Sequence, residues 1–160
     1  MRQCLSPRQL AHAPAQELHN GGFTAYAESP ARAEQMVAAL AGLEMPSDHG
    51  EAAIRAVHTP DYLDFLQTAP TKWADAGRPG DVIGYVWPVV GRRPLTLNRI
   101  DALVGQHSFD ASTPLAAETY EAAYWSTQSA LSALAVVQGG DPAAFALCRP
   151  PGHHAGADYL

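Results

Sequence analysis

Apolar side chains recur at helical spacing in two early segments, each directly after a hydroxyl residue and a proline. Behind Ser29-Pro30 the apolar positions are Ala33, Met36, Val37 and Leu40, and behind Thr59-Pro60 they are Tyr62, Leu63, Phe65 and Leu66. Ser or Thr is a favoured N-cap, and Pro suits the first helical position. The pattern predicts helices that begin at Pro30 and Pro60, with Gly42 able to end the first, and a short helix over about 48–57 between them.

The longest helical signal runs from Thr119 to Gln138 and stops at Gly139-Gly140. Its stripe of mostly small side chains, which suits close packing, is Ala122, Ala123, Ser126, Ala130, Ala133, Leu134 and Val137. The apolar run 144–148 that follows predicts a short buried strand. A helix, a tight turn and a buried strand indicate α/β architecture with a parallel sheet. The residues after 148 are then expected at the carboxyl end of a strand, where such sheets bind ligands.

Two segments show no period. Between 77 and 114, Gly and Pro are frequent and apolar residues come in short bursts. We expect a long irregular connection there, and both a functional segment and a plain surface excursion fit such a stretch. The segment 9–27 is also aperiodic and is expected to be an ordered loop or a short helix.

The adjacent pair His153-His154 follows Pro150-Pro151-Gly152, a stretch that combines fixed φ angles with one permissive residue. Histidine titrates near neutrality, so it serves as a general base or as a metal ligand. From spacing alone, three roles stay open: a ligand pair, an acid/base pair and a structural pair.

Composition excludes several other classes. Lys and Arg number 10 against 16 acidic residues, giving a net charge of -6, which argues against nucleic acid as a partner. Cys4 and Cys148 form no zinc-knuckle or disulfide pattern, and no apolar run approaches the length of a membrane span. The sequence therefore predicts a cytoplasmic protein that does not interact with a membrane.

The run Arg149-Pro150-Pro151-Gly152-His153-His154-Ala155 resembles the signature of the histone deacetylase superfamily, and its flanks resemble the acetylpolyamine amidohydrolase branch. Weaker matches follow in that branch's order: Glu17-Leu18, Gly21-Gly22, 30–34, Val57-His58, Tyr62-Leu63, 65–69, Trp87-Pro88, Gly105-Gln106 and 119–123. The resemblance implies an arginase/deacetylase-like parallel sheet flanked by helices. Residues 1–160 would form the N-terminal part of a single catalytic domain, incomplete and broken off after the histidine pair.

The resemblance also implies the chemistry. In this family a zinc ion and a histidine activate one water, which attacks an acetyl carbonyl. His154 matches the general base and acid, and His153 matches the neighbour that stays close to the water. The family's zinc ligands lie in an Asp-x-His motif and a later aspartate, so they are expected downstream of Leu160 and this chain is expected to be inactive alone. No Asp-x-His motif occurs within the chain, and His107 near Asp110 is interpreted as a chance pairing.

Three further residues receive roles by resemblance. Arg32 matches an arginine near an internal channel, although an ordinary arginine at a helix start fits equally well. Glu17 matches an acidic residue near the substrate entrance, against the alternative of a solvated charge. The branch can carry an acidic residue where this chain has Val104, which puts selectivity for acetylpolyamines in doubt, and Asp110 is a candidate for the missing charge.

The predicted function is therefore hydrolysis of a small acetylated amine, such as an acetylpolyamine, by the full-length enzyme. An acetyl-lysine deacetylase and a non-catalytic truncated fragment are the alternatives. The resemblance further implies a homodimer, with the connection 77–114 at its interface.

Overall fold

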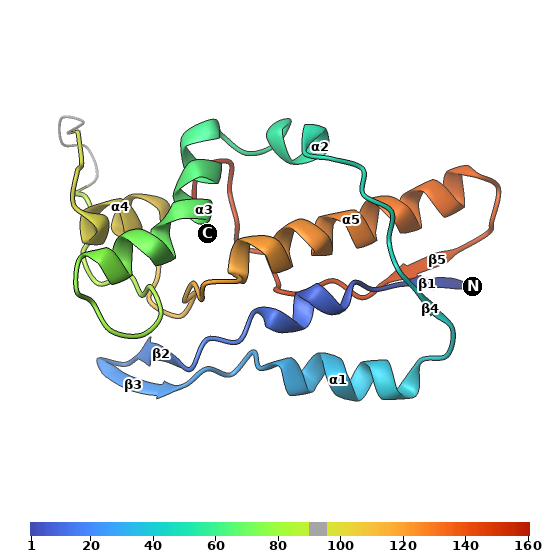
Figure 1. Cartoon of the computed structure of the whole chain (residues 1–160), viewed down its shortest axis with the longest axis horizontal. Coiled ribbons are helices and arrows are strands. Elements are labelled where there is room, and N and C mark those ends of the chain that lie inside the picture. Colours follow the sequence, from blue (N-terminus) through green and yellow to red (C-terminus); the bar gives the residue numbers. More distant parts are fainter. Residues whose placement is uncertain (90–95) are drawn as a thin grey trace. The chain divides into compact units, whose positions relative to one another are not determined.

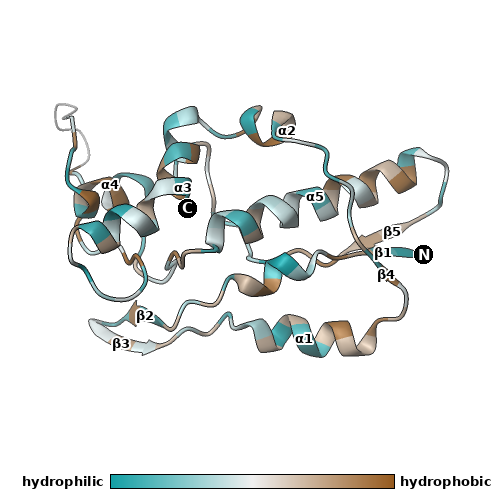
Figure 2. Ribbon diagram, viewed as in Figure 1, coloured by the Kyte–Doolittle hydropathy of each residue, from teal (hydrophilic) through white to brown (hydrophobic). Residues whose placement is uncertain are grey.

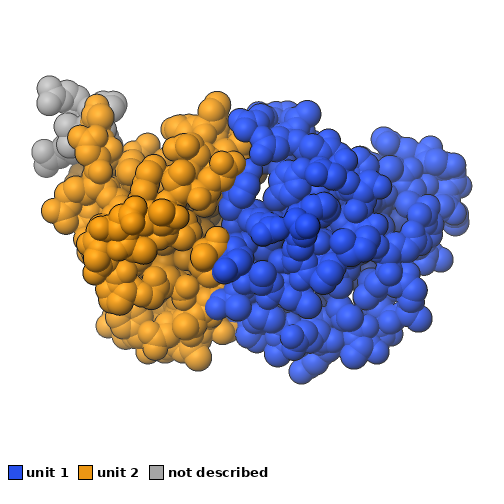
Figure 3. Space-filling view, in the orientation of Figure 1, with its two compact units in different colours: residues 1–13, 28–56, 118–151 blue, residues 14–27, 57–117, 152–160 orange. Residues whose placement is uncertain are grey.

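The computed structural model describes residues 1–89 and 96–160 (Figure 1). The chain divides into two compact units (Figure 3). Unit 1 comprises Met1–Ala13, Glu28–Ala56 and Glu118–Pro151; unit 2 comprises Pro14–Ala27, Val57–Ala117 and Gly152–Leu160. In chain order the elements are β1 (Arg2–Cys4), the 3₁₀ helix η1 (Pro7–Ala11), β2 (Gln16–His19), β3 (Gly22–Ala25), α1 (Pro30–Ala39), β4 (Leu43–Glu44), α2 (Ala52–Arg55), α3 (Pro60–Asp75), α4 (Ile100–His107), α5 (Thr119–Gln138) and β5 (Ala144–Ala146).

The two Pro-initiated helices begin where the sequence predicts them. Helix α1 starts at Pro30 with Ser29 as N-cap, and α3 starts at Pro60 with Thr59 as N-cap. Neither hydroxyl makes a capping hydrogen bond, so the fixed φ of proline and the extended conformation of the preceding residue set these starts. Helix α2 is shorter than the predicted 48–57, because Asp48 caps the turn at Gly50 instead, its Oδ1 accepting from the Gly50 N–H at 2.8 Å.

Unit 1 contains a three-stranded parallel sheet in the order β4-β1-β5, which confirms the predicted α/β class. Helix α5 packs along β1 and β5 (Figure 1). Strand β5 is shorter than predicted and is not buried: Phe145 is exposed, and the buried residue of the run 144–148 is Leu147, whose N–H donates to the Cys4 carbonyl at 3.0 Å. Figure 2 shows hydrophobic residues on β5 and on the last turns of α1 and α5.

The small-residue stripe predicted for α5 is only partly buried. Ala122 and Ala133 are buried, but Ala130, Leu134 and Val137 are exposed. The buried face carries polar side chains instead, and their burial is possible because each one hydrogen-bonds to neighbouring backbone or side-chain groups. The Gln128 amide oxygen accepts from the His49 N–H at 2.8 Å, and the Ser129 hydroxyl accepts from the Gln9 amide at 2.9 Å.

A buried histidine in unit 1 makes stability depend on pH. His12 bonds through Nδ1 to the Thr119 hydroxyl at 2.8 Å. Its burial, assisted by the Arg149 charge, lowers the pKa of His12 to about 4. The unfolded chain, with a histidine pKa near 6.5, therefore binds this proton first as pH falls.

We expect the free energy of unfolding to fall as pH drops from about 6.5 towards 4, by about 2 kcal/mol at pH 5 from this group alone. Urea unfolding of the wild type and of His12→Asn between pH 4.5 and 7.5 measures the effect. The wild type should show the steeper dependence on pH; equal slopes in the two proteins would contradict a buried neutral imidazole.

Unit 2 is built on α3, α4 and a β-hairpin. Strands β2 and β3 are antiparallel and turn through Asn20 and Gly21, both with positive φ. The segment 9–27 is expected from the sequence to be an ordered loop or a short helix. In the structure it contains the end of η1, in unit 1, and then this hairpin. The buried apolar cluster of the unit is Tyr62, Phe65, Ala69, Trp73, Val82, Ile100, Val104, Leu115 and Leu160.

The connection 77–114 is not irregular throughout, because it contains α4. Val82 and Leu115 exchange backbone hydrogen bonds of 2.9 and 3.0 Å near the two ends of this stretch. Within α4, a Cβ at Gly105 would lie 3.1 Å from the Trp87 Cα and overlap the Val86 carbonyl, so only glycine allows the segment 86–87 to cross the helix this closely. Residues 90–95, also part of the predicted connection, lie outside the described residues.

The described part of the chain includes no helix that is both long and apolar enough to cross a membrane.

Candidate functional site

The two histidines occupy the central positions of a tight turn. The Ala155 N–H donates to the Gly152 carbonyl at 3.0 Å, which closes a β-turn over Gly152–Ala155. The turn follows strand β5 along the chain, through a cis Arg149–Pro150 bond. Its two central side chains therefore project from one short, hydrogen-bonded piece of backbone.

Both imidazoles are exposed, and they lie against each other. The ring centroids of His153 and His154 are 4.1 Å apart, with 50° between the ring planes. Two rings this close can contact the same small molecule, and the nitrogens of a neutral imidazole can accept a proton from it. Because both rings are exposed, they are not core side chains, and their closeness is compatible with an acid/base pair or a ligand pair.

The chain directly after the turn is held by two other histidines. His58 donates from Nδ1 to the Gly156 carbonyl at 3.0 Å, and His107 donates from Nδ1 to the Asp158 carbonyl at 2.7 Å. The acceptors are carbonyls, so the proton must sit on Nδ1 in both rings. Two backbone bonds add to this: Thr59 N–H to Ala157 at 2.8 Å, and Leu160 N–H to His107 at 2.8 Å. The segment 156–160 is thereby fixed on α3 and α4.

Two aromatic rings flank the turn. The Tyr159 ring lies over Gly156, where an added Cβ would come within 2.6 Å of the ring carbon Cζ. The Phe109 ring lies 5.7 Å from the His154 ring and 6.0 Å from the Tyr159 ring, centroid to centroid. The histidine pair therefore sits beside an aromatic wall that sequence reasoning did not identify.

Glu17 and Asp110, the two predicted substrate-binding carboxylates, both lie in unit 2, on segments that touch. The Leu18 N–H donates to the Ala111 carbonyl at 3.1 Å, which joins β2 to the loop after α4. Glu17 is half-buried on β2. One oxygen of Asp110 accepts from the Ser112 N–H and the Thr113 hydroxyl, both at 2.9 Å, so this carboxylate also holds its own turn together.

His107 and Asp110 form separate interactions, as the interpretation of a chance pairing expects. Val104 is 3% exposed within the apolar cluster of unit 2. In this chain Val104 therefore contributes to packing, and the absence of an acidic side chain at this position leaves Glu17 and Asp110 as the predicted substrate-binding carboxylates.

Arg32 lies on the first turn of α1 in unit 1, with its side chain 62% exposed. It pairs with Glu28 at 3.5 Å, one turn earlier. Glu28 in turn pairs with Arg149 at 3.1 Å, and the Arg149 side chain is 3% exposed. The buried arginine of this unit is thus Arg149 of the motif itself, which sequence analysis did not single out.

The described residues do not fit a zinc ion by themselves. Across residues 1–89 and 96–160, no group of three or more His, Cys, Asp or Glu side chains could hold a metal.

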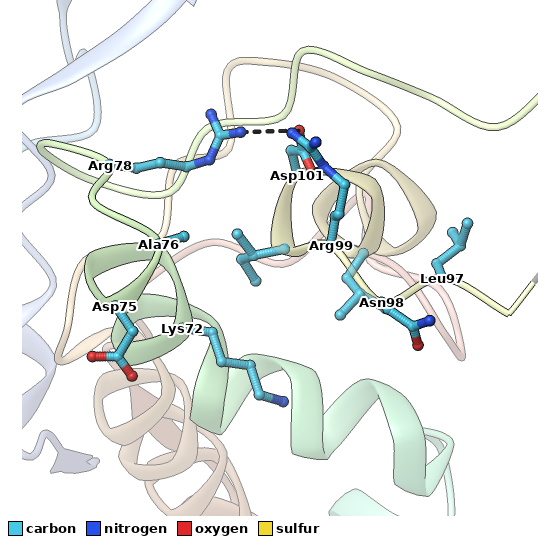
Figure 4. A pocket seen from close by; sticks show the side chains of 10 residues that line it. Lys72, Asp75, Ala76, Arg78, Leu97, Asn98, Arg99 and Asp101 are labelled. Atoms are coloured by element: carbon cyan, nitrogen blue, oxygen red, sulfur yellow. Dashed lines mark hydrogen bonds and ion pairs between the residues drawn. The ribbon is translucent and has the colours of Figure 1, made fainter.

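An open pocket of about 710 Å³ in unit 2 is lined by Lys72, Asp75, Arg78, Arg99, Asp101 and their neighbours, and does not include the histidine pair (Figure 4). There Arg99 and Arg78 each donate to Asp101 at 2.9 Å, and the Arg99 guanidinium, assisted by Arg78, lowers the pKa of Asp101 to about 2.

Comparison with known proteins gives concordant matches. The histone deacetylase domain matches residues 26–159. "Acetylpolyamine amidohydrolase 2" of Pseudomonas aeruginosa is 38% identical over 154 residues, covering 93% of this chain and 45% of the relative. "Acetylpolyamine amidohydrolase" of Burkholderia pseudomallei is 39% identical over 163 residues, covering 95% of this chain and 46% of the relative.

The fold also matches a solved structure. The crystal structure of acetylpolyamine aminohydrolase from Burkholderia pseudomallei superposes with a TM-score of 0.90 at 38% identity, over 100% of this chain and 48% of that one. This confirms the parallel sheet flanked by helices as the N-terminal half of a deacetylase fold. The chain spans about half the length of the relatives it matches.

Proposed function

The chain belongs to the histone deacetylase family, and from this premise we propose that the protein hydrolyses acetyl-amides, with residues 1–160 supplying the N-terminal part of one catalytic domain. The observation that carries the proposal is the exposed pair His153 and His154, with ring centroids 4.1 Å apart on a turn whose following segment, 156–160, is hydrogen-bonded to α4 and to the start of α3. An amide is hydrolysed when a water loses a proton as it attacks and the leaving nitrogen gains one. Two adjacent imidazoles are suited to both transfers.

In this proposal His154 takes the proton from the attacking water and later returns it to the amine that leaves. His153 lies close enough to His154 to hydrogen-bond the same water and to keep it oriented. A correctly placed general base contributes roughly 10²–10⁴-fold to the rate. Since the described residues do not fit zinc, no step on this chain is assigned to a metal, and the ligands are proposed to come from polypeptide beyond Leu160.

For the substrate we propose a small acetylated amine that carries a second, cationic nitrogen. Two acidic side chains of unit 2, Glu17 and Asp110, lie on segments joined by the bond from Leu18 to Ala111, and they would attract an ammonium group. The names of the relatives from Pseudomonas aeruginosa and Burkholderia pseudomallei agree with such a substrate.

An acetyl-lysine deacetylase is the second candidate. The carboxylate of Asp110 already accepts two hydrogen bonds within its own turn, which reduces its capacity to bind a polyamine. A substrate without a distal cation would not need that carboxylate, and an acetyl-lysine side chain is such a substrate.

Steady-state kinetics of the complete polypeptide that carries residues 1–160 separate the two candidates. We expect kcat/KM on acetylputrescine to exceed that on an acetyl-lysine peptide by at least about tenfold, the value of roughly one ammonium–carboxylate contact. The reverse preference would favour the second candidate. No release of acetate from either substrate would overturn the proposed function.

A further inference from the structure

The loop that follows α4, residues 108–110, carries Phe109 and is held in place by hydrogen bonds. Its Ser108 is buried, and the Ser108 hydroxyl donates to the Asp110 carbonyl at 2.7 Å. The Trp87 indole N–H donates to the Ser108 carbonyl at 2.9 Å, which ties the loop to the segment that crosses Gly105. The backbone before Phe109 is therefore bonded to Trp87, and the backbone after it is bonded within the loop.

From this loop the Phe109 ring contacts the turn Gly152–Ala155, which carries His153 and His154. It meets the His154 ring at 59° and the Tyr159 ring at 80°, both within the range of separations at which tilted and edge-on aromatic pairs attract. Yet Phe109 is 51% exposed and does not belong to the apolar cluster of the unit. A large apolar residue held half in solvent contributes little to a core, so its ring contacts account for its position better than core packing does.

The backbone bonds of the following segment do not fix the His154 side chain. The two histidine–carbonyl bonds and the two backbone bonds described above act on residues 156–160, beyond the turn. An exposed imidazole on a turn is free to change its χ1 and χ2 rotamers unless a neighbouring side chain restricts it. For His154 the neighbouring rings are His153 and Phe109.

We infer that Phe109 is a positioning residue for His154: its ring restricts the imidazole to the orientation in which it can accept a proton from the attacking water. The inference rests on the proposed role of His154. A displacement of about 1 Å of a catalytic group can cost on the order of 10²-fold in rate, so loss of one ring contact is expected to affect kcat and to leave substrate affinity almost unchanged.

The kinetic test compares Phe109→Ala with Phe23→Ala in the complete polypeptide. Phe23 is a matched control, because it is a 65% exposed phenylalanine of the same unit, on β3. We expect Phe109→Ala to lower kcat about tenfold with KM within about twofold, and Phe23→Ala to change neither. Phe109→Tyr keeps the ring and can place its hydroxyl in solvent, so this variant should retain most of the wild-type kcat.

A second readout does not need turnover. In ¹H–¹³C NMR spectra, the Hδ2 and Hε1 resonances of His154 should shift in Phe109→Ala and stay in place in Phe23→Ala, because a neighbouring ring no longer shields them. Unchanged His154 resonances, or a kcat of Phe109→Ala equal to that of Phe23→Ala, would overturn the inference. Should the wild type lack activity while the resonances shift, the contact stands and the proposed function fails.

If Phe109→Ala does not fold, Phe109→Leu replaces it as an apolar side chain without a ring. It should show the same loss of kcat and the same change in His154 resonances. A Phe109→Leu protein with wild-type kcat would show that apolar bulk alone suffices, and would also overturn the inference.

Discussion

Replacement of His154 by alanine is expected to reduce deacetylation by the complete polypeptide by about 10²–10⁴-fold, the range for loss of a general base. The loss should fall on kcat, because the general base accepts the proton as the transition state forms and not when the substrate binds. The zinc content per chain, measured by inductively coupled plasma mass spectrometry, should stay unchanged, because His154 is proposed as a base and not as a ligand.

His19→Ala is the matched control for this experiment. His19 is an exposed histidine at the end of β2 in the same unit, away from the motif. We expect the control to retain wild-type kcat and KM. If His154→Ala keeps more than about a tenth of the wild-type kcat, the assignment of the base is wrong, whatever the effect on KM.

Short sequence patterns predict those elements whose conformation is set by residues next to each other in the chain. The helix starts at Pro30 and Pro60 follow from a hydroxyl residue and a proline side by side, and both are confirmed. The hairpin could also have been predicted, because Asn20-Gly21 is the pair that two-residue turns with positive φ prefer. Helix α4 was missed although Ile100, Val104 and His107 are buried at spacings of four and three.

Other parts depend on contacts between distant residues, which no local pattern reports. Strands β1 and β4 are three and two residues long and exist because they pair in parallel with each other across about forty residues. The same holds at the site. The motif indicated His153 and His154, but the Phe109 ring contacts His154 from a loop more than forty residues away. Its exposed position gave no periodic signal.

Arg149 illustrates how a residue can be read as part of a motif while its structural role stays hidden. Its backbone N–H donates to the Gln9 amide oxygen at 2.6 Å, and its guanidinium donates to the backbone carbonyls of Gln9 and Glu28 at 2.8 and 3.0 Å. The same guanidinium pairs with the Glu28 carboxylate at 3.1 Å. Five donors in a planar fork can satisfy all three acceptors at once, and lysine cannot reproduce that geometry.

We therefore expect Arg149→Met to lower the free energy of unfolding by about 3–5 kcal/mol, because it leaves two carbonyls without their donor and the half-buried Glu28 carboxylate with only the exposed Arg32. For a chain of this size the corresponding fall in Tm is roughly 6–20 °C. Arg149→Lys keeps the charge and should lose less. Urea unfolding at pH 7.5, where His12 is neutral in both states, measures the difference without the contribution of that group.

Arg55→Ala supplies the contrast for this experiment. Arg55 pairs with Glu51 at 2.5 Å, a shorter distance than that between Arg149 and Glu28, but the Arg55 side chain is 52% exposed. Solvent screens such a pair, so its loss should cost less than about 1 kcal/mol. If the two substitutions have equal effects, burial does not set the strength of the Arg149 interactions. If Arg149→Met costs far more, the arginine of the motif is needed to hold η1 and Glu28 together, and so stabilises the segment that leads into the turn of His153 and His154.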